Sequence, residues 1–229
     1  MPSTEKLLHF LSSSLICAAG VGLLGYGMAA EWASADMACG PINEEFNGSS
    51  SLTIGLFSGT EDKISCPRIT KLGGKVAVFI RLGKIAGAPV ILHALVVILL
   101  GLALVGSAGS ILVSLYNSFS NPYQTYMGPI GVYTCSGLSV CVASLALILF
   151  VANAFLGQMF ETLVKADTAN VRLKEIKINL KVGFFLLIPY ICFNMVCILV
   201  VYLYVHTAYT RRKEQEKPTE DAPKEIMMY

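Results

Sequence analysis

The residues best suited to chemistry in this chain lie in one polar segment between two apolar stretches. Cys39 and Cys66 are the only two of the seven cysteines in that segment. A pair of this kind favours a disulfide, which requires an oxidising, extracytosolic compartment, whereas two free thiols are the alternative. Between the cysteines, Asn47, Gly48 and Ser49 form an N-glycosylation acceptor, which is modified only on the lumenal face of a membrane. Together these features predict that the segment lies outside the cytosol.

Groups for catalysis, metal binding or ion transport do not gather in the sequence. His9, His93 and His206 lie near three different membrane borders or spans, and no predicted span contains Asp or Glu. Intramembrane ionisable residues usually mark transport pathways, so a pump or proton-coupled carrier is disfavoured. We expect a protein that is not an enzyme, has no cofactor or metal and does not bind nucleic acid.

A long neutral stretch indicates that membrane-spanning helices position the cysteines, the glycosylation acceptor and the histidines. The 76 residues from Ile85 to Phe160 contain no Asp, Glu, Lys or Arg. A transmembrane helix needs roughly 20 mostly apolar residues, so the stretch holds two spans joined as a hairpin. Two further apolar runs, 7–29 and 182–206, complete four spans. The chain has 229 residues and 55% of them are hydrophobic, so little is left for a separate soluble domain.

We therefore predict a membrane all-α fold, a bundle of four transmembrane helices with a small extracellular β-sheet in the first loop. Short strands are expected over 51–58 and 75–80, which are rich in β-formers and bounded by Gly and Pro. A cleaved signal peptide is the alternative for the first span, although its apolar run is about twice the usual length. The predicted segments are a cytosolic N-terminus at 1–6, spans at 7–29, 89–115, 130–157 and 182–206, extracellular loops at 30–88 and 158–181, a cytosolic turn at 116–129 and a disordered cytosolic tail at 207–229.

The orientation of the bundle follows from the cysteine pair and the glycosylation acceptor more than from charge. Arg211, Arg212 and Lys213 directly after the fourth span favour cytosolic termini by the positive-inside rule. However, 11 of the 17 basic residues then lie in the two outer loops. Charge alone leaves the orientation open, and the chemistry between Cys39 and Cys66 favours both termini in the cytosol.

Several residues in and beside the spans predict how the bundle is held. Asn153 and Asn194 either line a path or bond a neighbouring helix. Pro189 is expected to interrupt the fourth span, and Trp32 is placed where an interfacial aromatic anchor is expected. Cys135 is a candidate for palmitoylation by position. Small residues recur every four positions and predict close helix packing or a homo-oligomer surface, as in Ser14, Ala18 and Gly22, in Gly106, Ser110 and Ser114, and in Cys135, Ser139 and Ala143.

Two groups of residues resemble a known family. The first is Trp32, Cys39, the Gly55, Leu56, Phe57 triplet and Cys66. The second is the hairpin segment, which includes Asn121, Pro122, Tyr123, Gly128 and Pro129. Both resemble the clarins, a small family within the claudin-like four-span group, and one clarin paralogue is the most similar in the hairpin. The sequence departs from claudins, which have Trp at the position of Phe57 and have both cysteines after the triplet. The claudin disulfide arrangement and a tight-junction role are therefore not implied.

The resemblance implies a glycosylated extracellular first loop, cytosolic termini and a plasma-membrane location. Met227 and Tyr229 place apolar side chains where a PDZ domain reads a C-terminal peptide, and clarins end similarly. The expected function is to organise or stabilise membrane-protein complexes, with a link to the cytoskeleton or to sensory-cell membranes. The expected partners are the lipid bilayer, other membrane proteins, a PDZ scaffold and a second copy of the chain. The alternative is a claudin-like junctional pore component or a channel accessory subunit.

Overall fold

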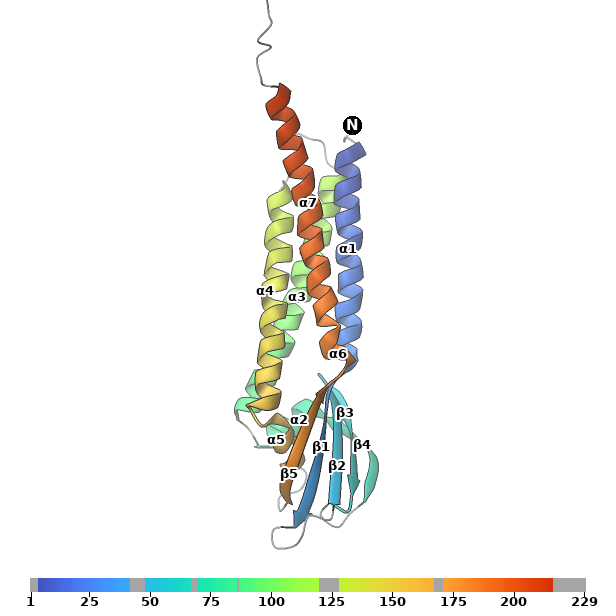
Figure 1. The fold of residues 1–229 in the computed structure, drawn as a ribbon, viewed down its shortest axis with the longest axis vertical. Coiled ribbons are helices and arrows are strands. Elements are labelled where there is room, and N and C mark those ends of the chain that lie inside the picture. The colour runs from blue at the N-terminus through green and yellow to red at the C-terminus, as the bar shows by residue number, and fades with distance from the viewer. Residues whose placement is uncertain are drawn as a thin grey trace, which may run out of the picture.

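The computed structural model describes residues 4–41, 48–66, 70–85, 87–119, 128–166 and 171–215. Within these ranges, four helical segments are long and apolar enough to cross a membrane, which confirms the predicted four spans. The start of the first and the end of the last lie together at the end of the bundle opposite the sheet (Figure 1). The spans are α1 (Thr4–Ala29), α3 (Ala88–Phe119), α4 (Gly128–Phe155) and the pair α6 (Val182–Phe185) and α7 (Leu187–Gln215).

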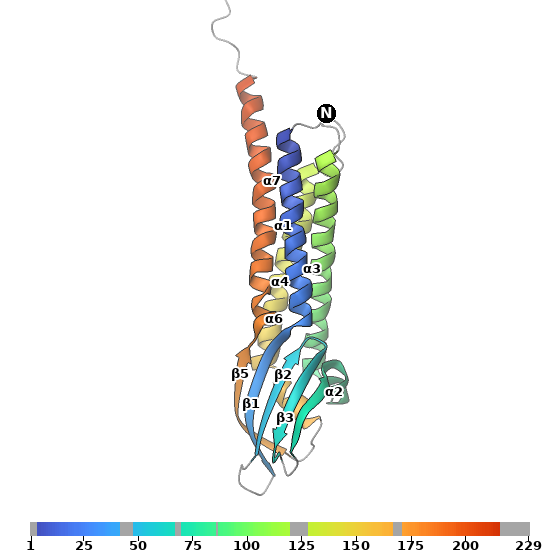
Figure 2. The same ribbon diagram turned by 90° about the vertical axis from the view of Figure 1, so that its right-hand side faces the viewer.

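A five-stranded antiparallel sheet continues from one end of the bundle (Figure 2). The strands are β1 (Glu31–Pro41), β2 (Gly48–Gly55), β3 (Ser58–Ile64), β4 (Lys71–Ala77) and β5 (Val171–Leu180), in the order β4-β3-β2-β1-β5. The prediction of a sheet confined to the first loop is wrong, because β5 comes from the loop between the third and fourth spans. Both loops therefore form one structure.

The predicted strand boundaries shift for local reasons. Residues 51–58 do not form one strand, since β2 ends at Gly55 and β3 begins at Ser58. Residues 78–80 belong to the short helix α2 (Val78–Ile85) rather than to a strand. Val78 and Leu82 are buried there, and their spacing of four residues places them on one face of a helix.

One face of the sheet is covered by α2 and by α5 (Met159–Lys165), as Figure 1 shows. Burial alternates along β2, where Leu52 and Ile54 are fully buried and Thr53 between them is partly exposed. These side chains share one apolar core with α5 residues such as Phe160 and with residues of the helical bundle. The sheet is therefore packed onto the membrane domain as one continuous core.

Small residues let the helices approach closely, as predicted, although on α1 the predicted face is partly wrong. A Cβ on Gly106 of α3 would lie 2.4 Å from the Ser139 hydroxyl of α4, so these helices meet at van der Waals distance. On α1, Ala18 and Gly22 are exposed. The stripe that packs inward follows the helical repeat of 3.6 residues rather than a strict four-residue spacing, and it includes Ser13, Cys17, Gly20, Leu24 and Gly27.

The fourth span is interrupted close to Pro189, as expected. The break between α6 and α7 falls at Leu186, three residues before the proline. Proline lacks the amide that would bond to the carbonyl one turn earlier, and its ring crowds that carbonyl. The short helix α6 follows β5 along the chain and leads into the bundle.

Candidate functional site

Trp32 joins the sheet to the bundle. It stands at the start of β1, two residues after Ala30, and its indole is fully buried. The indole Nε1 donates a hydrogen bond to the Gly27 carbonyl of α1 at 2.8 Å. Its ring meets Phe150 of α4 edge-on, with centroids 4.8 Å apart, and also Phe184 of α6. The predicted interfacial anchor is therefore wrong: Trp32 packs between helices and strand, away from lipid and water.

Glycines make room for this junction. A Cβ on Gly183 of α6 would lie 2.6 Å from Trp32 Cδ1 and 2.8 Å from the Glu31 carbonyl oxygen. At Gly27 the Gly183 carbonyl would be 3.4 Å from an added Cβ. The Lys181 amide also donates to the Trp32 carbonyl at 2.8 Å. The first and fourth spans and the two loops thus converge on one side chain.

The Gly55, Leu56, Phe57 triplet forms the sharp connection from β2 to β3. An added Cβ on Gly55 would lie 2.9 Å from the Ala30 carbonyl oxygen, so the chain passes too close for a side chain. Leu56 is fully buried, and its carbonyl lies 2.8 Å from His93 Nε2 of α3. Phe57 is 51% exposed, and its carbonyl accepts the Val78 amide at 3.1 Å. The triplet therefore fixes the loop to the second span and presents one aromatic ring outward.

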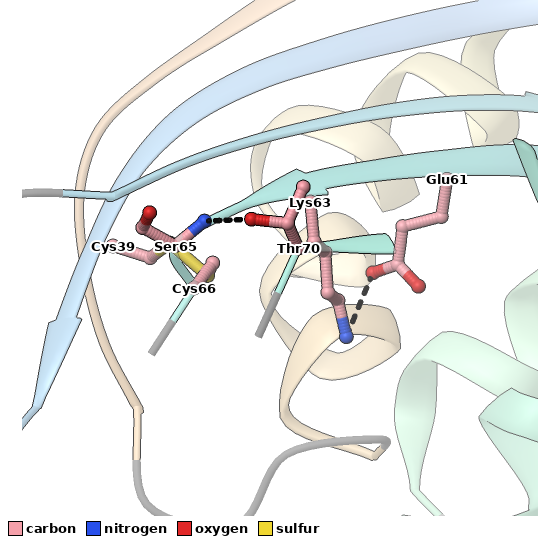
Figure 3. Close-up of a disulfide and its surroundings, with 6 residues drawn as sticks. All are labelled: Cys39, Glu61, Lys63, Ser65, Cys66 and Thr70. Atoms are coloured by element: carbon pink, nitrogen blue, oxygen red, sulfur yellow. Dashed lines mark hydrogen bonds and ion pairs between the residues drawn. A yellow bond between two sulfur atoms is a disulfide. The ribbon is translucent and has the colours of Figure 1, made fainter. Parts of the chain in front are cut away.

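A disulfide between Cys39 and Cys66 closes the end of the sheet away from the bundle (Figure 3). Cys39 is at the end of β1 and Cys66 follows β3, and both sulfurs are buried beside Leu173 of β5. The amide of Ser65, the residue before Cys66, donates a hydrogen bond to the Thr70 hydroxyl at 3.3 Å. A Cβ on Gly48 would lie only 2.2 Å from the Ser65 carbonyl oxygen. The sheet is consequently held at both ends, by Trp32 and by the disulfide.

An ion cluster lies beneath the sheet, between β3 and α2. Burial alternates along β3 so that Glu61 and Lys63 face inward and are 3% and 5% exposed. The Arg81 Nη1 of α2 donates to Glu61 Oε2 at 2.7 Å, and Lys63 Nζ lies 3.3 Å from Glu61 Oε1 (Figure 3 shows the Lys63 pair). Buried charges persist when they are paired in this way. Sequence reasoning missed the cluster, and the only signal for it was the alternation of β3 itself.

The outer face of the sheet is hollowed in two places, and both hollows are lined mostly by polar residues. A hollow of about 410 Å³ next to the bundle is lined by residues that include Glu31, Thr53 and Lys75. A second of about 280 Å³ lies further out, beside Asp36 and Lys177. Among the residues that the structure describes, no group of three or more His, Cys, Asp or Glu could hold a metal ion. This face offers hydroxyls and single charges of both signs, which suit contact with another protein.

Polar side chains inside the bundle bond neighbouring helices, which is the packing role predicted for the two asparagines. Asn194 of α7 accepts from the Ser107 hydroxyl of α3 at 3.2 Å. Ser107 also lies 2.8 Å from the Tyr190 hydroxyl. Asn153 of α4 donates to the Pro89 carbonyl at 3.0 Å. All are buried, so these groups connect α3 to α4 and α7.

Several predicted site residues lie outside the described residues. These are the glycosylation acceptor Asn47, the hairpin residues Asn121, Pro122 and Tyr123, and the C-terminal Met227 and Tyr229. Gly128 and Pro129 are described and begin α4, with Gly128 at φ 46°. A proline at the first turn of a helix matches its fixed backbone angle, so these two residues start the third span.

Comparison with known proteins finds relatives that match over their full length. Clarin-3 of Mus musculus is 33% identical over 233 residues, Clarin-3 of Homo sapiens 31% over 230 residues and Clarin-3 of Rattus norvegicus 32% over 230 residues. In each case the match covers 100% of both chains. No protein-family model matches the sequence. These relatives confirm the resemblance inferred from Trp32, the Gly55 to Phe57 triplet and the hairpin.

Proposed function

The chain belongs to the clarin family of multi-pass membrane proteins, and on that premise we propose that it organises or stabilises complexes of other proteins in the plasma membrane. In this role it is not an enzyme. The observation that carries the proposal is a sheet that is fixed at both ends and has two hollows, lined mostly by polar residues, on its outer face. Binding to a fixed surface avoids the entropic cost of ordering a loop.

The proposal assigns the sheet to the extracellular side and both termini to the cytosol. The Cys39–Cys66 disulfide supports this assignment, because such bonds persist in oxidising compartments. The opposite end of the bundle holds Arg211, which pairs with Glu5 at 2.7 Å on an exposed surface. In that orientation Asn47 is available for glycosylation, and Met227 and Tyr229 for a cytosolic PDZ scaffold that links the complex to the cytoskeleton.

The proposed partner surface is the outer face of the sheet. Two threonines that are paired across β2 and β3 provide a test of it. Thr53 pairs with Thr60, and both are at least partly exposed. We expect the amount of membrane protein that co-purifies with the full chain from digitonin-solubilised cells to fall at least about tenfold in the double variant Thr53→Arg, Thr60→Arg. Native gels would show the same loss as a shift from a large complex to the free chain.

The matched control places the same charges elsewhere. Thr207 and Thr210 are exposed near the far end of α7, so Thr207→Arg, Thr210→Arg adds two arginines away from the sheet. The control should keep the extracellular complexes. If both double variants retain every partner, the sheet is not the partner surface. If the unaltered chain migrates only as a free monomer, the organising role is wrong.

A claudin-like junctional pore is the second candidate, and the exposed charges Glu31, Asp36 and Lys75 on the sheet favour testing it. Conductance across an epithelial layer that expresses the chain separates the two functions. A pore predicts a change in ion selectivity that Lys75→Glu reverses in sign. A scaffold predicts no change in conductance with or without that substitution.

A further inference from the structure

Two cysteines that are far apart in the sequence meet in the middle of the membrane bundle. Cys17 of α1 and Cys197 of α7 are both fully buried, and their sulfur atoms are 2.6 Å apart. Non-bonded heavy atoms normally rest at about 3.5–4.0 Å, whereas the sulfurs of a disulfide are about 2.0 Å apart. The observed separation lies between these two values, so the two thiols are in direct contact across the helix interface.

The surrounding residues hold the pair in register. The Ser13 hydroxyl of α1 lies 2.8 Å from Cys197 Sγ and also reaches the Cys197 carbonyl at 3.5 Å. Ser136 of α4 lies 3.8 Å from Cys197 Sγ, and Ser110 of α3 lies 3.8 Å from Cys17 Sγ. Residues from all four spans therefore enclose the two sulfurs, which are already in contact.

A glycine on α1 allows α1 and α7 to approach closely. Gly20, one turn after Cys17, faces α7, and an added Cβ there would meet Phe193 Cβ at 3.5 Å. A methyl group there would make an ordinary van der Waals contact, and a side chain larger than that of alanine would collide with α7. The other three free cysteines differ in setting, since Cys141 and Cys192 are exposed on the outside of the bundle and Cys135 is partly exposed.

We propose that Cys17 and Cys197 are a site of oxidative modification and form a second disulfide, which ties the first span to the last. The oxidant is a hydroperoxide that enters the bilayer. The two thiols give up two electrons and two protons as the S–S bond forms. The O–O bond of the hydroperoxide breaks and takes up both, giving one alcohol and one water. The bond joins residues 180 positions apart and prevents α1 and α7 from separating.

Thiol counting on the unaltered full chain tests the proposal. Seven cysteines less the Cys39–Cys66 pair leave five free thiols, and a second disulfide leaves three. Membranes are treated with tert-butyl hydroperoxide or buffer, denatured in SDS and labelled with a maleimide that adds a visible mass to each thiol. We expect the hydroperoxide-treated chain to carry three labels. A second portion of the treated membranes, reduced before labelling under conditions that spare the Cys39–Cys66 bond, should carry five. An equal count in these two portions overturns the proposal.

A chain with an inserted protease site identifies which two cysteines are bonded. A protease site inserted between Tyr123 and Gln124 divides the chain so that Cys17, Cys39 and Cys66 lie in one fragment and Cys197 in the other. After hydroperoxide treatment and cleavage, the fragments should stay joined on a non-reducing gel and separate with reductant. Cys17→Ser and Cys197→Ser should each abolish the link, whereas Cys192→Ser, an exposed position on the same helix, should retain it. Fragments that separate without reductant, or a link that survives Cys17→Ser, contradict the assignment.

Discussion

The indole of Trp32 and the carbonyl of Gly27 are joined by a hydrogen bond of 2.8 Å across the point where α1 becomes β1. The bond ties the first residues of β1 to the last turn of the helix. It also directs the indole toward Phe150 rather than toward lipid. The position of Trp32 in the sequence indicates the membrane surface. In the fold, however, its side chain is the contact on which the position of the sheet depends.

Truncating Trp32 should release the sheet from the bundle. We expect Trp32→Ala to lower the free energy of unfolding by about 3–5 kcal/mol, because it leaves a cavity in the core. Trp32→Phe keeps an aromatic ring but loses the donor, and should cost about 0.5–1.5 kcal/mol for that bond. Unfolding of the detergent-solubilised chain by SDS titration measures both changes.

A half-exposed ring of the same loop serves as the control for Trp32. Phe57 is 51% exposed, so Phe57→Ala removes far less buried surface. It should change the unfolding free energy by much less than Trp32→Ala. Equal losses for the two variants would mean that Trp32 has no special role at the junction.

Adding one methyl group at Gly183 should disturb the same junction from the opposite side. The new Cβ would lie 2.6 Å from Trp32 Cδ1 and 2.9 Å from the Gly27 carbonyl oxygen. Because backbone must shift to accept it, Gly183→Ala should destabilise the chain by about 1–3 kcal/mol in the same titration. Gly25→Ala on α1 is the matched control, since no atom lies within 4 Å of its added Cβ. A stable Gly183→Ala variant would show that the junction tolerates expansion.

The buried ion cluster should be sensitive to loss of its carboxylate. Glu61→Gln removes the anion that lies between Arg81 and Lys63, and breaking such a buried pair costs about 3–5 kcal/mol. Thermal unfolding in detergent measures the effect as a lowered midpoint. Glu161→Gln removes an ion pair with Lys165 that is far more exposed, and should cost only about 0.3–0.5 kcal/mol. Similar midpoints for the two variants would contradict a structural role for the Glu61 cluster.

The sequence predicted the spans well because a bilayer constrains both length and charge. The neutral stretch 85–160 is long enough for two crossings, and a water-soluble chain would rarely run so far without a charged residue. The small-residue positions Gly106 and Ser139 were also recognisable, since only small residues permit close helix contact. These properties are local, so they can be read without knowing which helices are neighbours.

The parts that sequence reasoning missed depend on contacts between distant segments. In β5 the apolar residues Leu173 and Ile176 fall out of alternation, because Glu175 at φ 56° shifts the register. Allowing for one bulge would have revealed this strand. Trp32 carried no comparable signal, since a tryptophan just beyond a span looks the same whether it faces lipid or packs on Phe150. Only the fold distinguishes the two.

The orientation of the bundle is tested by Asn47, which lies in the segment between Cys39 and Cys66. We expect the intact chain in cell membranes to shift on a gel after glycosidase treatment, and Asn47→Gln to remove that shift, because the acceptor is modified only on the lumenal face. Ser58→Gln, an exposed change in the same loop, is the control and should leave the shift intact. If the intact chain shows no shift, a membrane-impermeant label on a cysteine placed at Ser58 decides the side. Labelling only after permeabilisation would place the sheet in the cytosol and overturn both the topology and the extracellular partner surface.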